Sequence, residues 1–248
     1  MARLIETLQS AAGTTLINED GVREELRLLP ALNDDELRAV MSGIPCPLPD
    51  EMREVFATTR GFEGGALETV DFSGLPGGFG LEEIFPAPIA IAADGFGNYW
   101  IVDLIKDSKI WGPVFYACHD APVVVFQAND VAHFVDEAIR FSNSPWKSEI
   151  DDVHDALTTR IWRENPGVLS YEECAESKDE DLRMFARSLD ASYEFVDLRT
   201  PKLGDGFSWG RYGRRFVVKR YGEKRIFANQ INKSRWQKLK DALKMAES

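Results

Sequence analysis

The residue types that most often carry out catalysis are scarce in this chain, which has three histidines and three cysteines. Cys118, His119 and Asp120 together have the residue types of a cysteine-based catalytic triad. Because consecutive residues of a strand point to opposite faces, these three side chains cannot converge on one another. Each would need a distant partner, and no motif marks one. We therefore expect a strand that runs into a polar turn, in a protein that is not an enzyme.

The other ionisable residues also lack the spacing of a catalytic or metal site. His154 lies among Asp151, Asp152 and Asp155, which is typical of the solvated start of a helix. The segment 94–98 lacks the alternating oxygen ligands and the closing glutamate of a calcium loop, so we expect a hairpin turn with glycines at positive φ. The sequence contains no phosphate loop, GxSxG or HExxH motif. It therefore predicts no metal site and no cofactor.

The cysteines and the apolar stretches indicate where the protein works. Cys46, Cys118 and Cys174 are odd in number, widely spaced and free of any CxxC pair, which argues against a disulfide framework and suits a reducing compartment. Residues 1–20 lack the basic and apolar regions of a secretory signal. The longest apolar stretches fall far short of the roughly 18 residues that a membrane span requires. We expect a cytoplasmic protein with no membrane partner.

Charge is distributed unevenly along the chain. The net charge is −12, and residues 1–198 hold 37 of the 41 acidic side chains but 15 of the 29 basic ones. An acidic surface of this kind accelerates the encounter with cationic partners and repels nucleic acid. Residues 199–248 are basic instead, and Arg215, Lys219 and Tyr221 mix cations with aromatics as single-strand binders do. We prefer the alternative in which this region docks on acidic residues of its own chain, because that partner is tethered.

Apolar periodicity and turn residues predict an α+β fold. A helix is expected from about Pro49, with Gly61 as its C-terminal cap, before a glycine-rich stretch to Phe85 that has little helix. Four short strands follow, and a helix capped by Asn129 or Asp130 closes the unit. The strands are expected at 87–92, 99–104, 114–117 and 123–126. Short strands joined by short turns imply an antiparallel meander sheet flanked by helices.

A domain boundary is expected at about residue 145, within the segment SNSPWKS. Residues 1–145 would form the meander domain, and residues 146–248 a smaller α+β module that is basic from about residue 199. The module is expected to have helices at 150–163, 180–189 and 234–246, and strands at 193–198, 215–221 and 224–228.

Three segments together resemble the SUKH superfamily, which groups bacterial immunity proteins with a yeast regulator of cell-wall synthesis. The family's opening helix and glycine-rich turn resemble LPDEMREVFATTRGFEGG (48–65), although Thr59-Arg60-Gly61 stands where the family usually has Asn-Gly. Its central hairpin looks like IAIAADGFGNYWIVDL (89–104), and its next strand is similar to GPVFYACHDAP (112–122). With the helix that follows, the resemblance covers about residues 34–141. It implies a SUKH-like fold and an immunity protein that binds and blocks a cognate toxin, with no catalytic residues to carry over.

Four functions remain open at this point. The leading one is a non-catalytic protein that binds and neutralises a cationic bacterial toxin. The alternatives are a regulatory scaffold or adaptor of the cell-wall branch, a nucleic-acid binder that uses the basic module, and an enzyme. The enzyme hypothesis fails if Cys118 and every histidine are buried or isolated from other titratable groups. For contact with a protein partner we predict the groups at the strand ends: Asp94, Phe96, Asn98, Trp100, His119 and Asp120.

Overall fold

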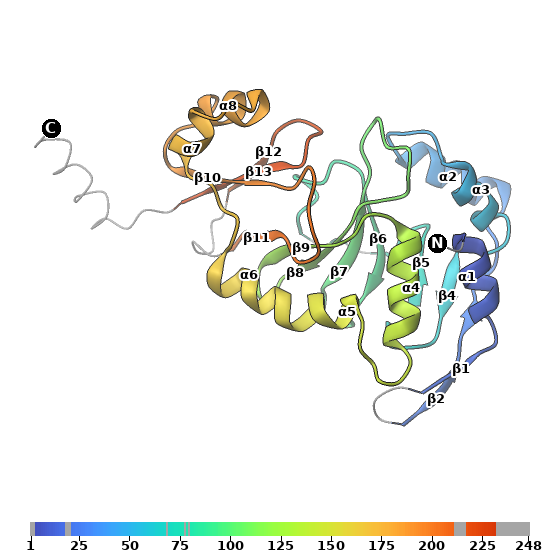
Figure 1. Cartoon of the computed structure of the whole chain (residues 1–248). Coiled ribbons are helices and arrows are strands. Elements are labelled where there is room, and N and C mark those ends of the chain that lie inside the picture. The colour runs from blue at the N-terminus through green and yellow to red at the C-terminus, as the bar shows by residue number, and fades with distance from the viewer. Residues whose placement is uncertain are drawn as a thin grey trace, which may run out of the picture.

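An eight-stranded antiparallel sheet runs through the middle of the molecule (Figure 1). The computed structural model describes residues 3–17, 21–67, 69–76, 78, 80–210 and 217–231. In spatial order the strands are β11 (Gly206–Ser208), β9 (Val123–Ala128), β8 (Val114–Cys118), β7 (Tyr99–Asp103), β6 (Pro88–Ala93), β5 (Thr69–Asp71), β4 (Gly61–Glu63) and β3 (Arg27–Leu28). The strands from β6 to β9 form the meander that the sequence predicts, and the α+β fold is confirmed.

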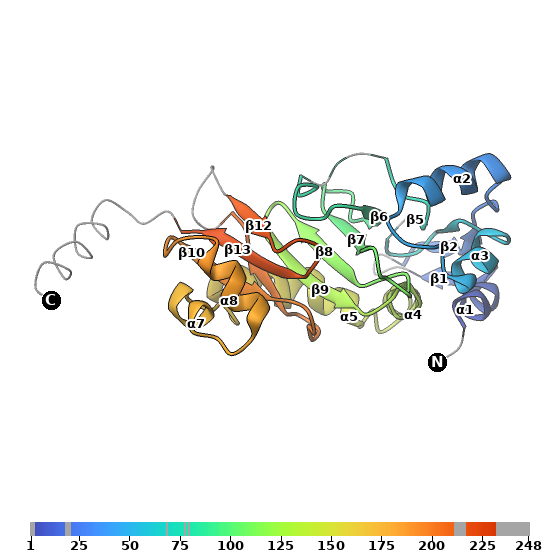
Figure 2. The same cartoon turned by 90° about the horizontal axis from the view of Figure 1, so that it is seen from above.

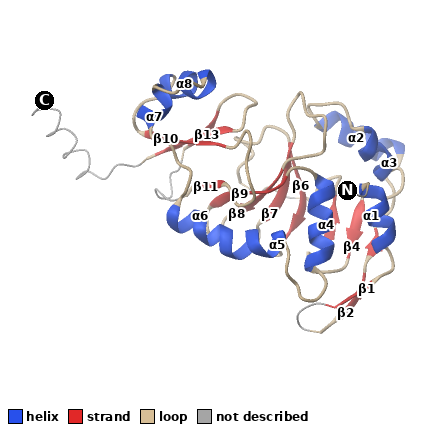
Figure 3. Cartoon of the chain, in the orientation of Figure 1, coloured by secondary structure: helices blue, strands red, loops and turns tan. Residues whose placement is uncertain are grey.

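Helices cover one face of this sheet (Figure 3). They are α1 (Leu4–Ala11), α3 (Asp50–Phe56), α4 (Val131–Phe141) and a helical stretch made of α5 (Glu149–Asp152), the π-helical η1 (Val153–Leu157) and α6 (Thr158–Glu164). Leu8, Phe134 and Ile150 are fully buried in the core on this side. Because alternate strand residues point to opposite faces, Tyr116 of β8 belongs to this core and Phe115 to the core on the other side.

A three-stranded sheet lies over the other face of the large sheet (Figure 2). Its strands, in order, are β10 (Tyr193–Asp197), β13 (Ile226–Gln230) and β12 (Val218–Arg220), and each pair is antiparallel. Phe227 of the small sheet shares a buried cluster with Phe115 and Phe207 of the large one. The outer side of the small sheet is covered by α7 (Tyr171–Ala175) and α8 (Glu180–Arg187), where Phe185 packs on Phe195.

Residues on both sides of the expected boundary near residue 145 contribute to the large sheet and its cores. β11 pairs with β9, and a Cβ at Gly206 would lie 2.1 Å from the carbonyl oxygen of Val124, so the close approach requires glycine there. Ile150 and Ile161 belong to the core beneath the helices. The division of the chain into separate units at 1–145 and 146–248 therefore stays a prediction. In the structure, strands from both sides of residue 145 belong to the same large sheet.

The glycine-rich stretch before the meander contains more strand than expected. β4 and β5 pair within it, and Gly61, the expected helix cap, lies in β4 with a φ of +154°. The preceding helix already ends at Phe56, with Ala57 as its cap. A Cβ at position 61 would lie 1.9 Å from the carbonyl oxygen of Val70. The expected role of this glycine is therefore wrong, because it permits the close approach of β5 and does not end the helix.

The remaining elements differ from the predicted ones in smaller ways. The hairpin of β1 (Thr15–Ile17) and β2 (Arg23–Glu25) projects from the large sheet, and α2 (Asp34–Gly43) follows β3 (Figure 1). The expected helix at 150–163 is interrupted by η1, and β12 forms the described end of the expected strand at 215–221. The expected helix at 234–246 lies outside the described residues. None of the described helices has both the length and the apolar character needed to cross a membrane.

Candidate functional site

One carboxylate organises the turn between β6 and β7. The side chain of Asp94 is only 6% exposed. Its Oδ1 accepts the backbone N–H groups of Phe96 at 2.9 Å and of Asn98 at 3.2 Å. Its Oδ2 accepts the Asn98 side-chain amide at 2.6 Å and the Tyr116 hydroxyl at 3.1 Å. The two glycines of the turn have positive φ, as the sequence predicts. These donors fix the turn in one conformation.

The neighbouring turn, between β8 and β9, is attached to the first one through Asn98. The Asn98 side chain is almost completely buried, and its Oδ1 accepts the backbone N–H of His119 at 2.8 Å. The same oxygen lies 2.9 Å from Nδ1 of the His119 ring. Asp120 follows, with Oδ2 3.5 Å from Asn98 Nδ2 and Oδ1 3.3 Å from His119 Nε2. The two turns therefore form one surface at this end of the sheet.

His154 joins this surface from a third element. Its Nε2 lies 3.2 Å from Asp94 Oδ2, and its ring stacks on Trp100 with the centroids 6.0 Å apart. The residue lies in η1, where the Thr158 hydroxyl donates to the carbonyl oxygen of Val153 at 2.7 Å. Single π-helical turns occur frequently at functional sites. His154 is exposed, in line with the expected solvated helix, but its ring also packs on a core tryptophan and contacts a buried carboxylate.

These contacts shift the ionisation of the buried groups. Burial raises the pKa of the Asp94 carboxyl, but the hydrogen bonds from Asn98, Phe96 and His154 outweigh it, so that this pKa lies below its ordinary value. Burial also raises the pKa of the Tyr116 phenol and of the Cys118 thiol. At neutral pH the site holds an ionised Asp94, a neutral phenol and a protonated thiol. Because the thiolate is the nucleophilic form, Cys118 has low reactivity here.

The arrangement is better suited to holding a surface rigid than to binding a substrate. A hollow of about 230 Å³ lies between the two turns and η1, lined by residues that include Asp94, Tyr116 and His154. Small-molecule sites usually span about 300–1,000 Å³, so this hollow is below that range. His119 and His154 each contact an aspartate, and the geometric condition that would remove the enzyme hypothesis is therefore not met. Because its pKa is raised, the Cys118 thiol is not an activated nucleophile next to these histidines.

One apolar side chain stands on the outside of the rigid turn. Phe96 is 76% exposed, the largest exposed fraction among the large hydrophobic side chains that the structure describes. His119 and Asp120 are exposed beside it, and a Cβ at Gly97 would lie 3.2 Å from the His119 ring. Exposed aromatic side chains on preorganised turns, next to a carboxylate, are typical of binding hot spots in protein interfaces. We call Phe96, His119 and Asp120 the turn surface.

The structure brings the six residues predicted for partner contact to one end of the sheet, but only half of them reach solvent freely. Phe96, His119 and Asp120 are exposed, whereas Asp94, Asn98 and Trp100 support them from the inside. Sequence reasoning missed Tyr116, which is hidden in an apolar core strand, and His154, which lies 60 residues after Asp94. No spacing in the sequence connects these two residues to the turn.

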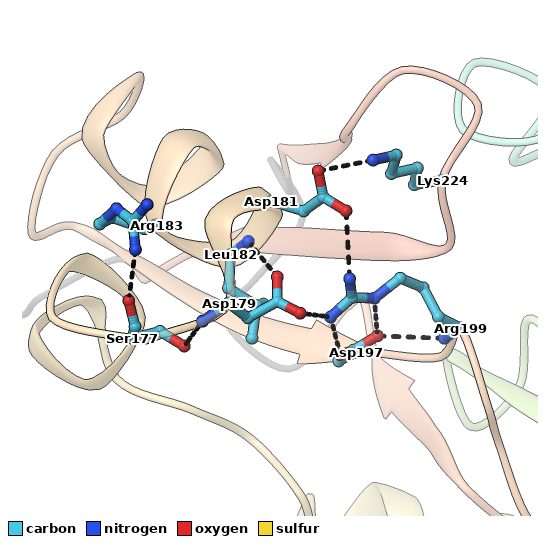
Figure 4. A network of polar contacts seen from close by, with 8 residues as sticks. All are labelled: Ser177, Asp179, Asp181, Leu182, Arg183, Asp197, Arg199 and Lys224. Atoms are coloured by element: carbon cyan, nitrogen blue, oxygen red, sulfur yellow. Dashed lines mark hydrogen bonds and ion pairs between the residues drawn. The ribbon is translucent and has the colours of Figure 1, made fainter.

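The described part of the basic region pairs with acidic residues of its own chain. In Figure 4, Arg199 lies between Asp179, Asp181 and Asp197, at 2.8, 3.1 and 2.6 Å. The hydrogen bonds that Arg199 donates to the Asp197 carboxylate raise the pKa of the Arg199 guanidinium. Lys224 Nζ lies 2.5 Å from Asp181 in the same network. The preferred prediction, that this region docks on its own chain, holds for these residues.

Two further arginines of the basic region reach the large sheet. Asp103 at the end of β7 is completely buried, and its Oδ1 lies 2.9 Å from Arg220 Nη1, while its Oδ2 lies 2.7 Å from Arg225 Nε. Arg220 also donates to the carbonyl oxygen of Ile84 at 3.0 Å, and its guanidinium lies over the Phe227 ring. Because these cations are buried and paired, they are not available to bind phosphates. This weakens the nucleic-acid hypothesis for the described part of the region.

No family model, curated protein or solved structure matches the chain. The resemblance to the SUKH superfamily therefore stays a prediction that depends on the three sequence segments. In the part of the chain that the structure describes, no three His, Cys, Asp or Glu side chains are grouped closely enough to hold a metal ion.

Proposed function

We propose that this chain is a non-catalytic, cytoplasmic protein that binds a cationic protein through the turn surface, and that it works as a SUKH-type immunity protein against a bacterial toxin. The observation that carries the proposal is the exposed Phe96 on a turn that the buried Asp94 holds rigid. A rigid aromatic side chain binds at low entropic cost, because the turn is already in its bound conformation.

The charge of the chain supports a cationic partner. Residues 1–198 carry most of the acidic side chains, and Asp120 on the turn surface is 66% exposed. Asp155 is exposed next to His154 on η1. Carboxylates in these positions accelerate the encounter with a positively charged surface and disfavour an acidic one. Many toxins that act on nucleic acid are cationic, which fits the immunity role implied by the resemblance.

The proposal is tested by growth rescue with the Phe96→Ala variant. The chain is coexpressed with a cationic toxin encoded beside its own gene, and growth of the host is measured. Wild type should restore growth, and the variant should bind the purified toxin about 30-fold more weakly, which corresponds to about 2 kcal/mol. Met184→Ala is the matched control, because Met184 is 51% exposed on α8, outside the turn surface.

Two results would contradict the proposal. One is full rescue by Phe96→Ala, which would move the interface elsewhere. The other is the absence of any neutralised toxin together with many weakly bound proteins in co-purification, which would favour the scaffold alternative.

A further inference from the structure

The hollow between the two turns and η1 is large enough for one side chain of another protein. Its volume is about 230 Å³. An apolar cavity of about 150 Å³ already holds a molecule of benzene, so a single long side chain fits. Asp94 and Asp120 line the hollow, and no lysine or arginine is among the described residues that do so. Carboxylates without a neighbouring lysine or arginine favour a cationic occupant.

Two hydrogen-bond acceptors face each other beside this hollow. The Asn98 amide has a fixed orientation, because its Nδ2 donates to the Asp94 carboxylate and its Oδ1 accepts the backbone N–H of His119. The same oxygen therefore accepts from His119 Nδ1, which carries the ring proton of the neutral histidine. His119 Nε2 is left as an acceptor, and it lies 3.3 Å from Oδ1 of Asp120, which also accepts. These two atoms repel each other until a donor joins them.

His154 supplies a further acceptor from η1. Its Nε2 lies 3.2 Å from Oδ2 of Asp94, which is ionised and can only accept, so Nε2 carries the ring proton. Nδ1 of the neutral ring is then an acceptor, and among the described residues none donates to it. The side chain is 42% exposed, so that a group from outside can reach it. Asp94 contributes charge but no further contact, because it is buried and already accepts several donors.

The guanidinium group of arginine fits this set of acceptors. It carries five N–H donors in one plane, has no acceptor and keeps its positive charge. Its N–H groups can join the facing acceptors of His119 and Asp120, while its plane lies against the exposed ring of Phe96. The ammonium group of lysine has three donors and is not planar, so it matches the ring and the carboxylate less well.

We infer that this hollow binds one arginine side chain of the partner protein, with the guanidinium donating to Asp120, His119 and His154 and lying against the Phe96 ring. The inference rests on the proposed function and deepens it, because it names the group through which the cationic partner is recognised. Arginine is among the residues that contribute most to binding in protein interfaces.

The test uses acetyl-Gly-Arg-Gly-amide and two matched peptides, one with citrulline and one with lysine in place of arginine. Citrulline keeps the shape of arginine without its charge. The chain has three histidines, so the ring nitrogens of the full protein labelled with ¹⁵N-histidine give few signals in NMR spectra. The arginine peptide should shift the signals of His119 and His154 with a Kd of about 1 mM. His133 pairs with Glu149 outside the hollow, and its signals should not move.

The comparison peptides and two variants show which contacts matter. The citrulline peptide should bind at least about tenfold more weakly and the lysine peptide about fivefold more weakly. Asp120→Asn should weaken binding of the arginine peptide about tenfold. Asp107→Asn is the matched control, because Asp107 is exposed in the loop between β7 and β8, outside the hollow, and it should leave binding unchanged.

The ring-nitrogen shifts of the free protein test the argument independently. At pH 7.5 they should show the proton on Nδ1 of His119 and on Nε2 of His154. A doubly protonated His119 at this pH would overturn the inference, because that proton would already join Nε2 to Asp120.

Three binding results would also overturn it. These are no shift with the arginine peptide, equal binding of the citrulline or lysine peptide, and equal effects of Asp120→Asn and Asp107→Asn while circular dichroism shows both to be folded. If the peptide does not bind but Phe96→Ala loses the toxin, the proposed function stands and this inference fails. If the peptide binds but Phe96→Ala rescues growth fully, the arginine site stands and the proposed function fails.

Discussion

At the residue scale, the site depends on a single carboxylate. Asp94 accepts hydrogen bonds from two backbone N–H groups, an amide and a phenol, and it also contacts the ring of His154. A carboxylate with this many donors is stabilised in its ionised form. It connects the β6–β7 turn to β8 and to η1, and so fixes the direction in which Phe96 is presented.

Replacing Asp94 by asparagine should therefore destabilise the protein by about 2 kcal/mol at neutral pH, because hydrogen bonds to a charged acceptor are lost. The native pKa of Asp94 is depressed, so its contribution is present above the unfolded pKa of about 3.9 and is lost as pH falls through the lower native value. Urea unfolding at pH 7 and near pH 3 measures this, and the difference in the free energy of unfolding between wild type and Asp94→Asn should shrink in acid.

Asp120→Asn, at an exposed position, is the control and should change stability little. A difference that is equal at both pH values would refute the role of the ionised carboxylate.

At the element scale, a buried ionic cluster joins the two sheets. Asp103 belongs to β7 of the large sheet, Arg220 to β12 of the small sheet, and Arg225 precedes β13. Among the described residues, Asp103 is the carboxylate that pairs with both guanidiniums, and all three side chains are largely buried. Removing one member of such a cluster costs more than the cluster contributes, because uncompensated charge is left buried.

Asp103→Asn should for this reason lower the free energy of unfolding by about 3–5 kcal/mol. Glu63→Gln is a suitable control, because the Glu63–Arg27 ion pair is exposed and should contribute less than about 1 kcal/mol. Chemical denaturation followed by tryptophan fluorescence measures both variants. If the two substitutions prove equally mild, the cluster does not hold the sheets together.

The elements that the sequence predicts well are those with strong local pattern. The strands from β6 to β9 are nearly continuous apolar runs between glycine-rich or aspartate-rich turns, and α4 has both its apolar face and its Asp130 cap in the sequence. β4 and β5 are only three residues long, so pairing across the sheet determines them. The turn residues of the site were also predictable from DGFGN, whereas the contact of His154 depends on a helix packed over the sheet.

At the scale of the whole molecule, several basic side chains of the C-terminal region are paired with carboxylates of the chain, whereas carboxylates near the turn surface are exposed. The side chains of Arg199, Arg220, Lys224 and Arg225 form ion pairs with acidic residues of the same chain. The carboxylates around the turn surface are instead left toward solvent, with Asp120 and Asp155 exposed. The molecule thus has an exposed aromatic side chain beside an exposed carboxylate at one end of its large sheet, as the proposed binding of a cationic partner requires.

Hydrogen exchange of the chain with and without the cationic toxin that we propose as its partner tests this central claim most directly. Binding through the turn surface predicts added protection of the backbone amides at 95–97 and 119–121, with little change in α7 and α8. Protection confined to other segments, with the amides of both turns exchanging as in the free protein, would contradict it.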